Sequence, residues 1–511
     1  MSARPLFNLF RLPAFALSEM AVIRLLIALV VWRLWPQSVD FVGQPSPAGL
    51  ALLVEHWFDW HLAWLSHPTA GTLSSALLAA LLVVYVSGAA PILSCFAITL
   101  LLSLMGALEN SQGFTTHHGQ VVTLVMLAQF LGHGWQRLST WKRPDLMAMT
   151  PADRRLREHR AGLFAAQQAV VATYVISAIT KYKASGFGWI ADAQYFPLQI
   201  LKARQADFYS TLDPETAVAG HDRVTLWMEQ AMTSSTLATQ ILVGSALILE
   251  FGAVLALLGR WWGVGISLLL ISFHLTVSKV MGLNFRYNIW LLAILFLLPP
   301  ALHYLRLRAV EPLLASSTAP LIQLWRRIPA KIMLLGIAAS YLTISGPGWR
   351  DIGHGFHPDR VRQAEVYPLS SFPMYSGFSD APNLVYITDG DGHPVAIMHE
   401  FNVVSSALKK IYDTELRIIR DQLNKSMRAM TAEERSPAGT ETLRRLRDHL
   451  APEAFTDNAF PTLHLHEIRI TRGPEGFDHD DLMVGTLHTP PDYQPPSATD
   501  PPGDDPAIGD E

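Results

Sequence analysis

Long apolar runs recur along the first two thirds of the chain, separated by short polar breaks. A run of about 17–25 apolar residues is the length that a helix needs to cross the hydrocarbon of a bilayer. The breaks at 87–91, 259–260 and 284–286 are short enough to join neighbouring helices as hairpins. The pattern predicts nine transmembrane helices, at 19–35, 73–88, 89–108, 119–135, 163–181, 235–258, 262–282, 286–302 and 330–347.

The pattern changes after residue 348. Leu384–Thr388 is rich in β-forming residues and runs into Asp389–Pro394, a turn sequence that predicts a hairpin with 395–398 as its second strand. Apolar positions at helical spacing predict helices over 404–430 and 441–450.

Alternation of apolar and polar positions over 462–470 predicts a half-buried strand. Beyond Thr489 the chain is rich in Pro and Asp and has little to bury, which predicts a disordered tail. The predicted fold class is an all-α polytopic membrane bundle with a C-terminal α+β domain. The predicted domains are 1–348, 349–488 and 489–511.

Composition supports the membrane assignment over a soluble protein. Hydrophobic residues make up 50% of the chain and charged residues only 16%, whereas soluble domains carry about 25% charged residues. The single cysteine, Cys95, excludes an internal disulfide and a CxxC motif. The first apolar run contains Arg24 and Arg33 and has no small-residue cleavage site, so we expect an uncleaved first span.

The distribution of charge predicts the orientation. Segment 136–160 holds seven basic residues against three acids, and 303–331 holds five against one. The positive-inside rule then places the N-terminus in the cytoplasm and, with nine spans, the C-terminal domain and the loops 36–72 and 182–234 outside. Residues 349–511 have a net charge of −12 and the rest +8, which argues against nucleic acid as a partner of the soluble part.

Several ionisable residues fall at membrane depth, where each costs roughly 2.5–3.5 kcal/mol and needs a reason. Glu250 either pairs with an arginine of a neighbouring helix or serves a site. Lys279, like Lys181 and Lys183, lies near a span end and can snorkel to the interface. The remaining intramembrane charges and histidine are Arg24, Arg33 and His274.

Taken together, the polar groups predict one cavity that opens to the exterior. His117 and His118, Lys181 and Lys183, and the Asn284–Arg286 turn all fall at exterior span ends, with His274 in the outer half of its helix. A lysine in such an apolar cavity can act as a base, and histidines can orient an anion. No HExxH motif supports zinc, and Asp389–Gly392 lacks the ligand series of an EF-hand, so we expect no metal.

Five stretches resemble the vitamin K-dependent γ-carboxylase family, which overlaps the bacterial horizontally transferred transmembrane (HTTM) proteins. Tyr174–Tyr182, with Trp189 after it, is similar to the family's "Y-x-x-(A/S)-G-x-x-K-(L/Y)…W" segment. Leu249–Gly252, Ser272–His274 and Gly282–Phe285 resemble its paired helices, which carry an acid, then a histidine, then a "G-x-x-F" turn. His117–Gln120 is similar to the family's exterior "N-H-x-x-L" entry, and Arg24 matches its first-span arginine.

The resemblance implies a bacterial inner-membrane enzyme with a periplasmic domain. In that family a lysine deprotonates a reduced quinone, which reacts with O₂ to give a base that prepares a glutamate for CO₂. Lys181 is then the catalytic base, His118 an orienting residue and His274 a helper. The implied substrate is a secreted peptide or a small molecule. The candidates for binding the substrate or quinone are His117, Lys183, Trp189, Glu250, Asn284 and Arg286.

Departures from the family pattern leave alternatives open. Ala178 replaces the family glycine, and the distance from Lys181 to Trp189 allows Lys183 to be the base instead. The soluble part does not match the larger lumenal domain of the animal enzymes. A non-catalytic accessory, maturation or immunity protein is therefore the second hypothesis. A transporter ranks third, because the two halves show no inverted repeat.

Overall fold

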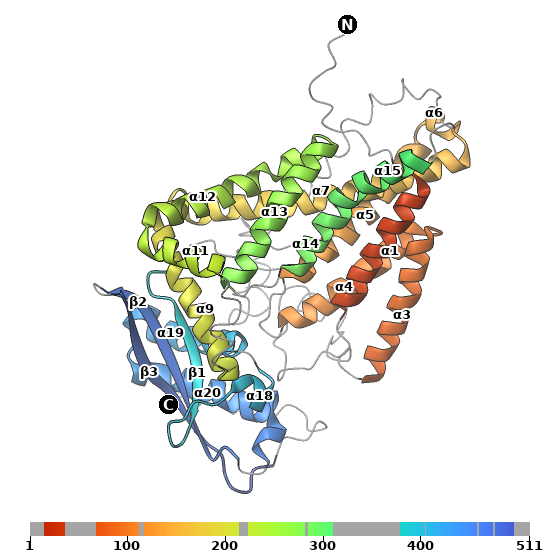
Figure 1. The fold of residues 1–511 in the computed structure, drawn as a ribbon. Coiled ribbons are helices and arrows are strands. Elements are labelled where there is room, and N and C mark those ends of the chain that lie inside the picture. The colour runs from red at the N-terminus through yellow and green to blue at the C-terminus, as the bar shows by residue number, and fades with distance from the viewer. Residues whose placement is uncertain are drawn as a thin grey trace.

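The computed structural model describes residues 15–35, 68–111, 117–213, 223–281, 285–309, 379–403, 405–456, 459–473 and 476–494. These residues are mostly helical, and a small three-stranded sheet lies near the C-terminus. The long helices form a bundle, and the sheet lies at one end of it with helices of its own (Figure 1).

The bundle is built from helices of both halves of the N-terminal region. The first set is α1 (Leu17–Leu34), α3 (Pro68–Ser87), α4 (Pro91–Ser111), α5 (His117–Trp141) and the short α6 (Pro144–Met147). The second set is α7 (Pro151–Ser185), α12 (Thr236–Gly252), η3 (Ala253–Leu257), α13 (Arg260–Met281), α14 (Arg286–Leu292), η4 (Ala293–Leu297) and α15 (Leu298–Ala309).

Five of the described helices are long and apolar enough to cross a membrane. They agree with the predicted spans at 73–88, 163–181, 235–258, 262–282 and 286–302. Apolar side chains such as Ile248, Leu268 and Leu269 point outward from the bundle and are exposed, as expected for a lipid-facing surface.

The remaining four predicted spans are not among these five helices. Predicted spans 19–35, 89–108 and 119–135 are helices α1, α4 and α5. α5 buries Gln129, His133 and Gln136 inside the bundle, so its polar residues face protein rather than lipid. The predicted ninth span, 330–347, lies outside the described residues.

Helix α7 is the central helix of the bundle, and its ends follow local sequence rules. Thr150 caps its start by accepting a hydrogen bond from the Asp153 amide, with Pro151 as the first helical residue. Gly186, at φ +59°, ends it. Against α5 the backbones approach closely, because a Cβ at Gly132 would lie only 2.9 Å from the Ala161 carbonyl oxygen.

The segment predicted as an exterior loop, 182–234, is largely helical. It contains α8 (Gly188–Ala191), η2 (Asp192–Tyr195), α9 (Phe196–Thr211) and α11 (Arg223–Ser234). The apolar residues of α8 and η2 pack against Val243 and Leu247 of α12. Ile200 of α9 and Met232 of α11 pack against Val280 of α13. The predicted connection between spans is therefore a helical segment with enough apolar surface to cover the end of the bundle.

The C-terminal domain is a three-stranded antiparallel sheet in the order β1 (Asn383–Asp389), β2 (Thr462–Gly473) and β3 (Gly476–His488). Its helical elements are α18 (Ile397–Phe401), α19 (Ser405–Leu423), η7 (Met427–Ala429), α20 (Ala432–Arg445), η8 (Leu446–Leu450) and η9 (Pro452–Phe455). The strands predicted at 384–388 and 462–470 are confirmed by β1 and β2. The helix predicted over 404–430 is confirmed by α19 as far as Leu423. The helix predicted over 441–450 is the end of α20 with η8.

Both faces of this sheet are covered. Val385 and Ile387 face the core formed with α18, α19 and α20. Leu384 and Tyr386 face the opposite side, where Leu198 of α9 packs on them. The bundle and the C-terminal domain therefore share a hydrophobic contact through α9, which Figure 1 shows between α11 and β1.

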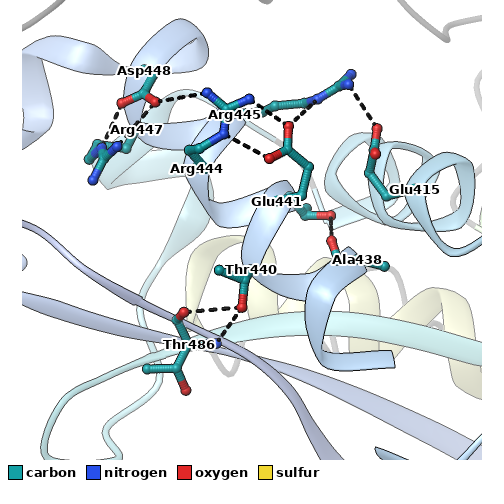
Figure 2. A network of polar contacts seen from close by, with 10 residues as sticks. Glu415, Ala438, Thr440, Glu441, Arg444, Arg445, Arg447, Asp448 and Thr486 are labelled. Carbon is teal, nitrogen blue, oxygen red and sulfur yellow. Dashed lines mark hydrogen bonds and ion pairs between the residues drawn. The ribbon is translucent and has the colours of Figure 1, made fainter. Parts of the chain in front are cut away.

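Helix α20 crosses the sheet at backbone contact. A Cβ at Gly439 would lie 2.0 Å from the Val484 carbonyl oxygen, so only glycine fits there. Thr440 Oγ1 donates to the Thr486 carbonyl oxygen at 3.2 Å, and Thr486 N donates back to Thr440 Oγ1 at 3.3 Å (Figure 2). These contacts fix the helix on β3.

The outer side of α20 carries a network of ion pairs (Figure 2). Glu441 binds Arg444 at 2.7 Å and Arg445 at 3.1 Å. Arg445 also pairs with Glu415 of α19 at 3.0 Å, and Arg444 with Asp448 at 3.4 Å. Single exposed pairs contribute little, but this network joins α19 to α20.

Two further expectations for this domain are wrong in part, and one strand was missed. The predicted hairpin forms only at its turn: Thr388 and Pro394 make an antiparallel bridge and Val395 N donates to the Ile387 carbonyl oxygen at 2.9 Å, but α18 begins at Ile397. Strand β3 was not predicted. The packed domain also continues into the predicted tail, since Tyr493 packs on the core and its hydroxyl donates to the Arg447 carbonyl oxygen at 3.1 Å. Residues 495–511 lie outside the described residues.

Candidate functional site

A buried ion pair lies inside the bundle, between α7 and α12. Lys181 Nζ donates to both carboxylate oxygens of Glu250, at 2.6 Å each. The side chains are only 8% and 6% exposed. The Ser177 hydroxyl, one turn before Lys181 on α7, also bonds the Glu250 carboxylate. Taking two charges out of water is costly, so a pair at this depth needs such additional hydrogen bonds.

The walls around the pair are aromatic and apolar. The ring of Trp189 on α8 lies with its centroid 5.1 Å from Lys181 Nζ, a cation–π contact. Trp189 is itself buried with Ala178 of α7 and Val243 and Leu247 of α12. This environment keeps the ammonium and the carboxylate away from water and strengthens their attraction.

A second polar group adjoins the pair. His274 of α13 shares a hydrogen bond of 2.6 Å between its Nε2 and the Tyr174 hydroxyl of α7. Asn288 of α14 also bonds Tyr174. The Phe285 ring lies 4.5 Å from the imidazole, centroid to centroid. His274 Nδ1 is buried and bonds no side chain or backbone group of the described residues.

The two groups form one site. Lys181 is near enough to His274 for its charge to act on the imidazole, and Glu250 is near enough to act on Tyr174. Four helices, α7, α12, α13 and α14, supply the polar atoms, and α8 supplies Trp189. α9 and α11 lie over the adjoining end of the bundle, so the site is enclosed rather than open at the surface.

The structure brings together four of the predicted residues: Lys181, His274, Trp189 and Glu250. Glu250 pairs with a lysine and not with an arginine, contrary to one expectation. Lys183 and Arg286 are exposed and lie outside this group. Asn284 and the side chains of His117 and His118 lie outside the described residues, although the backbone of both histidines begins α5.

Sequence reasoning missed Tyr174, Ser177 and Asn288 as members of the site. Tyr174 and Ser177 precede Lys181 by seven and four residues, and this spacing places all three side chains on one face of a helix. That signal was available in the sequence. Asn288 has no such local signal, because its contact with Tyr174 depends on how α14 packs on α7.

One cluster in the C-terminal domain has the donors of a metal site. Ligand atoms of Asp389, Asp391 and His393 all lie within 4.8 Å of one another. Asp389 Oδ1 accepts hydrogen bonds from the Asp391 amide at 3.0 Å and the His393 amide at 2.8 Å. These bonds are those of an Asx turn and account for the placement of the three residues.

The fold and this site define a class: a helical membrane-type bundle with a buried site of a lysine, a carboxylate, a histidine and a tyrosine, joined to a small α+β domain. Comparison of the chain with protein-family models, with curated proteins and with solved structures gave no match. The chemistry of the site is that of proton exchange and anion stabilisation, since each group can hold or move a proton.

Proposed function

We propose that the chain is a nine-span enzyme of a bacterial inner membrane, with a cytoplasmic N-terminus and a periplasmic C-terminal domain. On this proposal it uses a reduced quinone and O₂ to carboxylate a peptide or small molecule at the exterior face, as the vitamin K-dependent γ-carboxylases do. The five membrane-length helices and the basic segments 136–160 and 303–331 support the topology.

One observation carries the chemical part of the proposal. The buried Lys181–Glu250 pair lies beside His274, whose Nδ1 is buried and without a bond to the described residues. An ion pair that only joined two helices would not need a neighbouring histidine with a nitrogen that makes no hydrogen bond. A ligand oxygen placed there would satisfy Nδ1 and face the pair.

A reduced quinone fits this set of groups. Trp189 and Phe285 would hold its aromatic ring and His274 a phenolic oxygen, and the bilayer would supply it laterally to a site inside the bundle. When bound, it supplies the strong base that follows from its reaction with O₂ and that removes the γ-proton of a glutamate before CO₂ adds.

The chain's own residues manage the first proton. Lys181 and Glu250 are close enough to act as one proton-exchanging unit. The unit accepts the hydroxyl proton of the reduced quinone, and Lys181 then remains as an ammonium that stabilises the resulting anion. Tyr174 holds the His274 ring through its Nε2, so the imidazole keeps Nδ1 toward the ligand.

The test is reconstitution of the purified protein with several reduced quinones, O₂ and labelled bicarbonate. We expect quinone epoxide and incorporated label with the unaltered protein, loss of both in Lys181→Ala and Glu250→Ala, and retention in Lys183→Ala. Lys142→Ala, an exposed lysine directly after the end of α5, is the matched control. Absence of both products with every quinone would contradict the proposal.

The second candidate is a non-catalytic accessory protein for a secreted peptide. It is supported by the bidentate contact that already engages Lys181 fully, as in a pair that only holds two helices together. This candidate predicts that replacing both Lys181 and Glu250 by apolar residues of similar size leaves the cellular phenotype intact. Changes on the exterior domain would then abolish it.

A further inference from the structure

A second buried polar cluster lies away from the Lys181 site, where α1, α3, α4, α5 and α7 meet. Its central residue is Arg24 of α1, which is 5% exposed. Arg24 Nη1 bonds His159 Nδ1 of α7 at 3.0 Å. His133 of α5 meets His159 edge to face, with ring centroids 5.6 Å apart. This cluster is on the side that the positive-inside rule assigns to the cytoplasm.

The charge of Arg24 has no carboxylate partner. No ion pair joins Arg24 to any residue of the described chain, and its Nε is buried without a hydrogen bond. The ionisable groups near enough to offset its charge are Tyr85 and Cys95, both weak acids. A buried guanidinium without a counter-charge is costly, so the site calls for an anion.

The backbone beside Arg24 is a second reason to expect an anion here. Gly88, at φ +68°, lies against the guanidinium, and a Cβ there would be 2.8 Å from Nη1. Gly88 directly follows Ser87, the last residue of α3, and Pro91 begins α4 three residues later, with Cys95 in the first turns of that helix. The N-terminus of α4 presents partial positive charge, which attracts an anion.

The imidazoles fit an anion as well. His159 accepts from Arg24 through Nδ1, so it is neutral and holds the guanidinium in place. His133 is 2% exposed, and its ring bonds the backbone of Glu158. Its Nδ1 is buried without a bond to any described residue and can accept a hydrogen bond from a protonated phosphate oxygen. A Cβ at Gly162 would lie 2.3 Å from His133 Nε2, so only a glycine leaves room for this ring.

We infer that Arg24, His133 and the start of α4 form a binding site for a phosphate group. Arginine binds phosphate oxygens through two parallel N–H groups, and Arg24 has Nε and a second amino group for this. The phosphate belongs either to the headgroup of an anionic lipid or to a free phosphate from the cytoplasm. The site is distinct from the Lys181 group and does not depend on the proposed carboxylation.

Cys95 is the single cysteine of the chain, neighbours Arg24 and is buried, so a maleimide reaches it only when this part of the bundle opens. Its alkylation rate therefore reports how strongly a bound anion holds the site closed. The purified, delipidated protein is alkylated with a maleimide in the presence of inorganic phosphate, phosphatidylglycerol or phosphatidylcholine. At ten times the dissociation constant, bound anion should slow alkylation about ten-fold. If both phosphate and phosphatidylglycerol slow the alkylation of Cys95, the site binds phosphate groups in general. If only phosphatidylglycerol slows it, the site binds a lipid headgroup.

Two outcomes would overturn the inference: no effect of phosphate or phosphatidylglycerol, or an equal effect of phosphatidylcholine. Arg24→Gln should abolish the slowing, and Arg24→Lys should retain part of it. Arg33→Gln, an exposed arginine of the same helix, should leave it unchanged. If Arg24→Gln does not fold, Arg24→Lys still tests the inference. Equal protection of Cys95 in Arg24→Lys and in the unaltered protein would contradict a site that binds phosphate through two parallel N–H groups of Arg24.

Discussion

Lys181 Nζ lies 2.6 Å from each carboxylate oxygen of Glu250, although the two residues are 69 positions apart in the chain. The contact joins α7 to α12 at the point where Trp189 closes the site. Both candidate functions depend on this interaction. In an enzyme the pair would exchange protons with the substrate, whereas in an accessory protein it would only keep α7 and α12 together.

Replacing one residue of the Lys181–Glu250 pair should have a different effect on stability from replacing both. Glu250→Gln leaves the Lys181 ammonium buried without a counter-charge, and we expect it to destabilise the protein by about 3–5 kcal/mol. Replacing both residues, by Lys181→Met with Glu250→Leu, should restore most of this stability while activity stays lost. Thermal unfolding of the purified variants measures the first effect. A double variant as unstable as the single one would show that the pair contributes more than charge balance.

A second buried pair makes the C-terminal domain sensitive to acid. Arg435 and Glu467 are 2% and 1% exposed and lie 2.7 Å apart. Burial acts to raise the pKa of Glu467, but the charges of Arg435 and Arg469 outweigh it and hold that pKa below its usual value. The ionised carboxylate therefore stabilises the fold above pH about 4.3, and this contribution is lost as pH falls through the lowered pKa.

We expect acid unfolding of the C-terminal domain to depend on this pair. Glu467→Gln should flatten the loss of stability below pH about 4.3 and lower stability at neutral pH by about 3–5 kcal/mol. The signal is near-ultraviolet circular dichroism of the full chain along a pH series. Glu433→Gln, at an exposed glutamate of α20, serves as control. An unchanged acid midpoint in Glu467→Gln would refute the assignment.

The contact between α9 and the C-terminal domain predicts a rise of stability with pH in the alkaline range. Burial, with the like charge of Lys409 adding to it, lowers the pKa of Lys202 from 10.5 to about 8, against the effect of Asp413. Because the folded state disfavours the charged lysine, this penalty is fully present below pH 8 and fades between pH 8 and 10.5. Stability should therefore rise over that range.

Lys202→Met removes the penalty and should stabilise the folded state at pH 7 by about 1–3 kcal/mol. Hydrogen exchange of the amides of α9 and β1 reports this directly, as slower exchange in the variant at pH 7 and equal exchange near pH 10.5. Lys142→Met is the control at an exposed lysine. Faster exchange in Lys202→Met would mean that the ammonium stabilises the contact.

Much of the bundle and part of the site could be predicted from the sequence. Membrane-length apolar runs depend on composition alone, and Lys181 with Tyr174 and Ser177 follows from helical spacing. The partner of Lys181 could not be predicted, because Glu250 reaches it only through the packing of α12 on α7. The position of α9 could not be predicted either, because some of its apolar residues pack on the end of the bundle and others on the sheet.

The missed strand has a physical explanation too. β3 carries Asp478, Asp480 and Asp481, and aspartate is depleted in strands. It forms because β2 offers a partner along its whole length, not because of its own propensity. The hairpin is incomplete because the Asp389–Pro394 turn reverses the chain and leads into α18 rather than into a strand.

The end of the C-terminal domain gives the last prediction. Tyr493 packs 6.5 Å from Phe455, centroid to centroid, and its hydroxyl bonds the Arg447 carbonyl oxygen. Deleting 495–511 should leave the unfolding temperature unchanged, whereas deleting 489–511 should lower stability by about 1–3 kcal/mol, as should Tyr493→Ala. Tyr493→Phe keeps the ring and should lose only about 1 kcal/mol. If both truncations unfold at the same temperature, the tyrosine contributes nothing and the domain ends with β3.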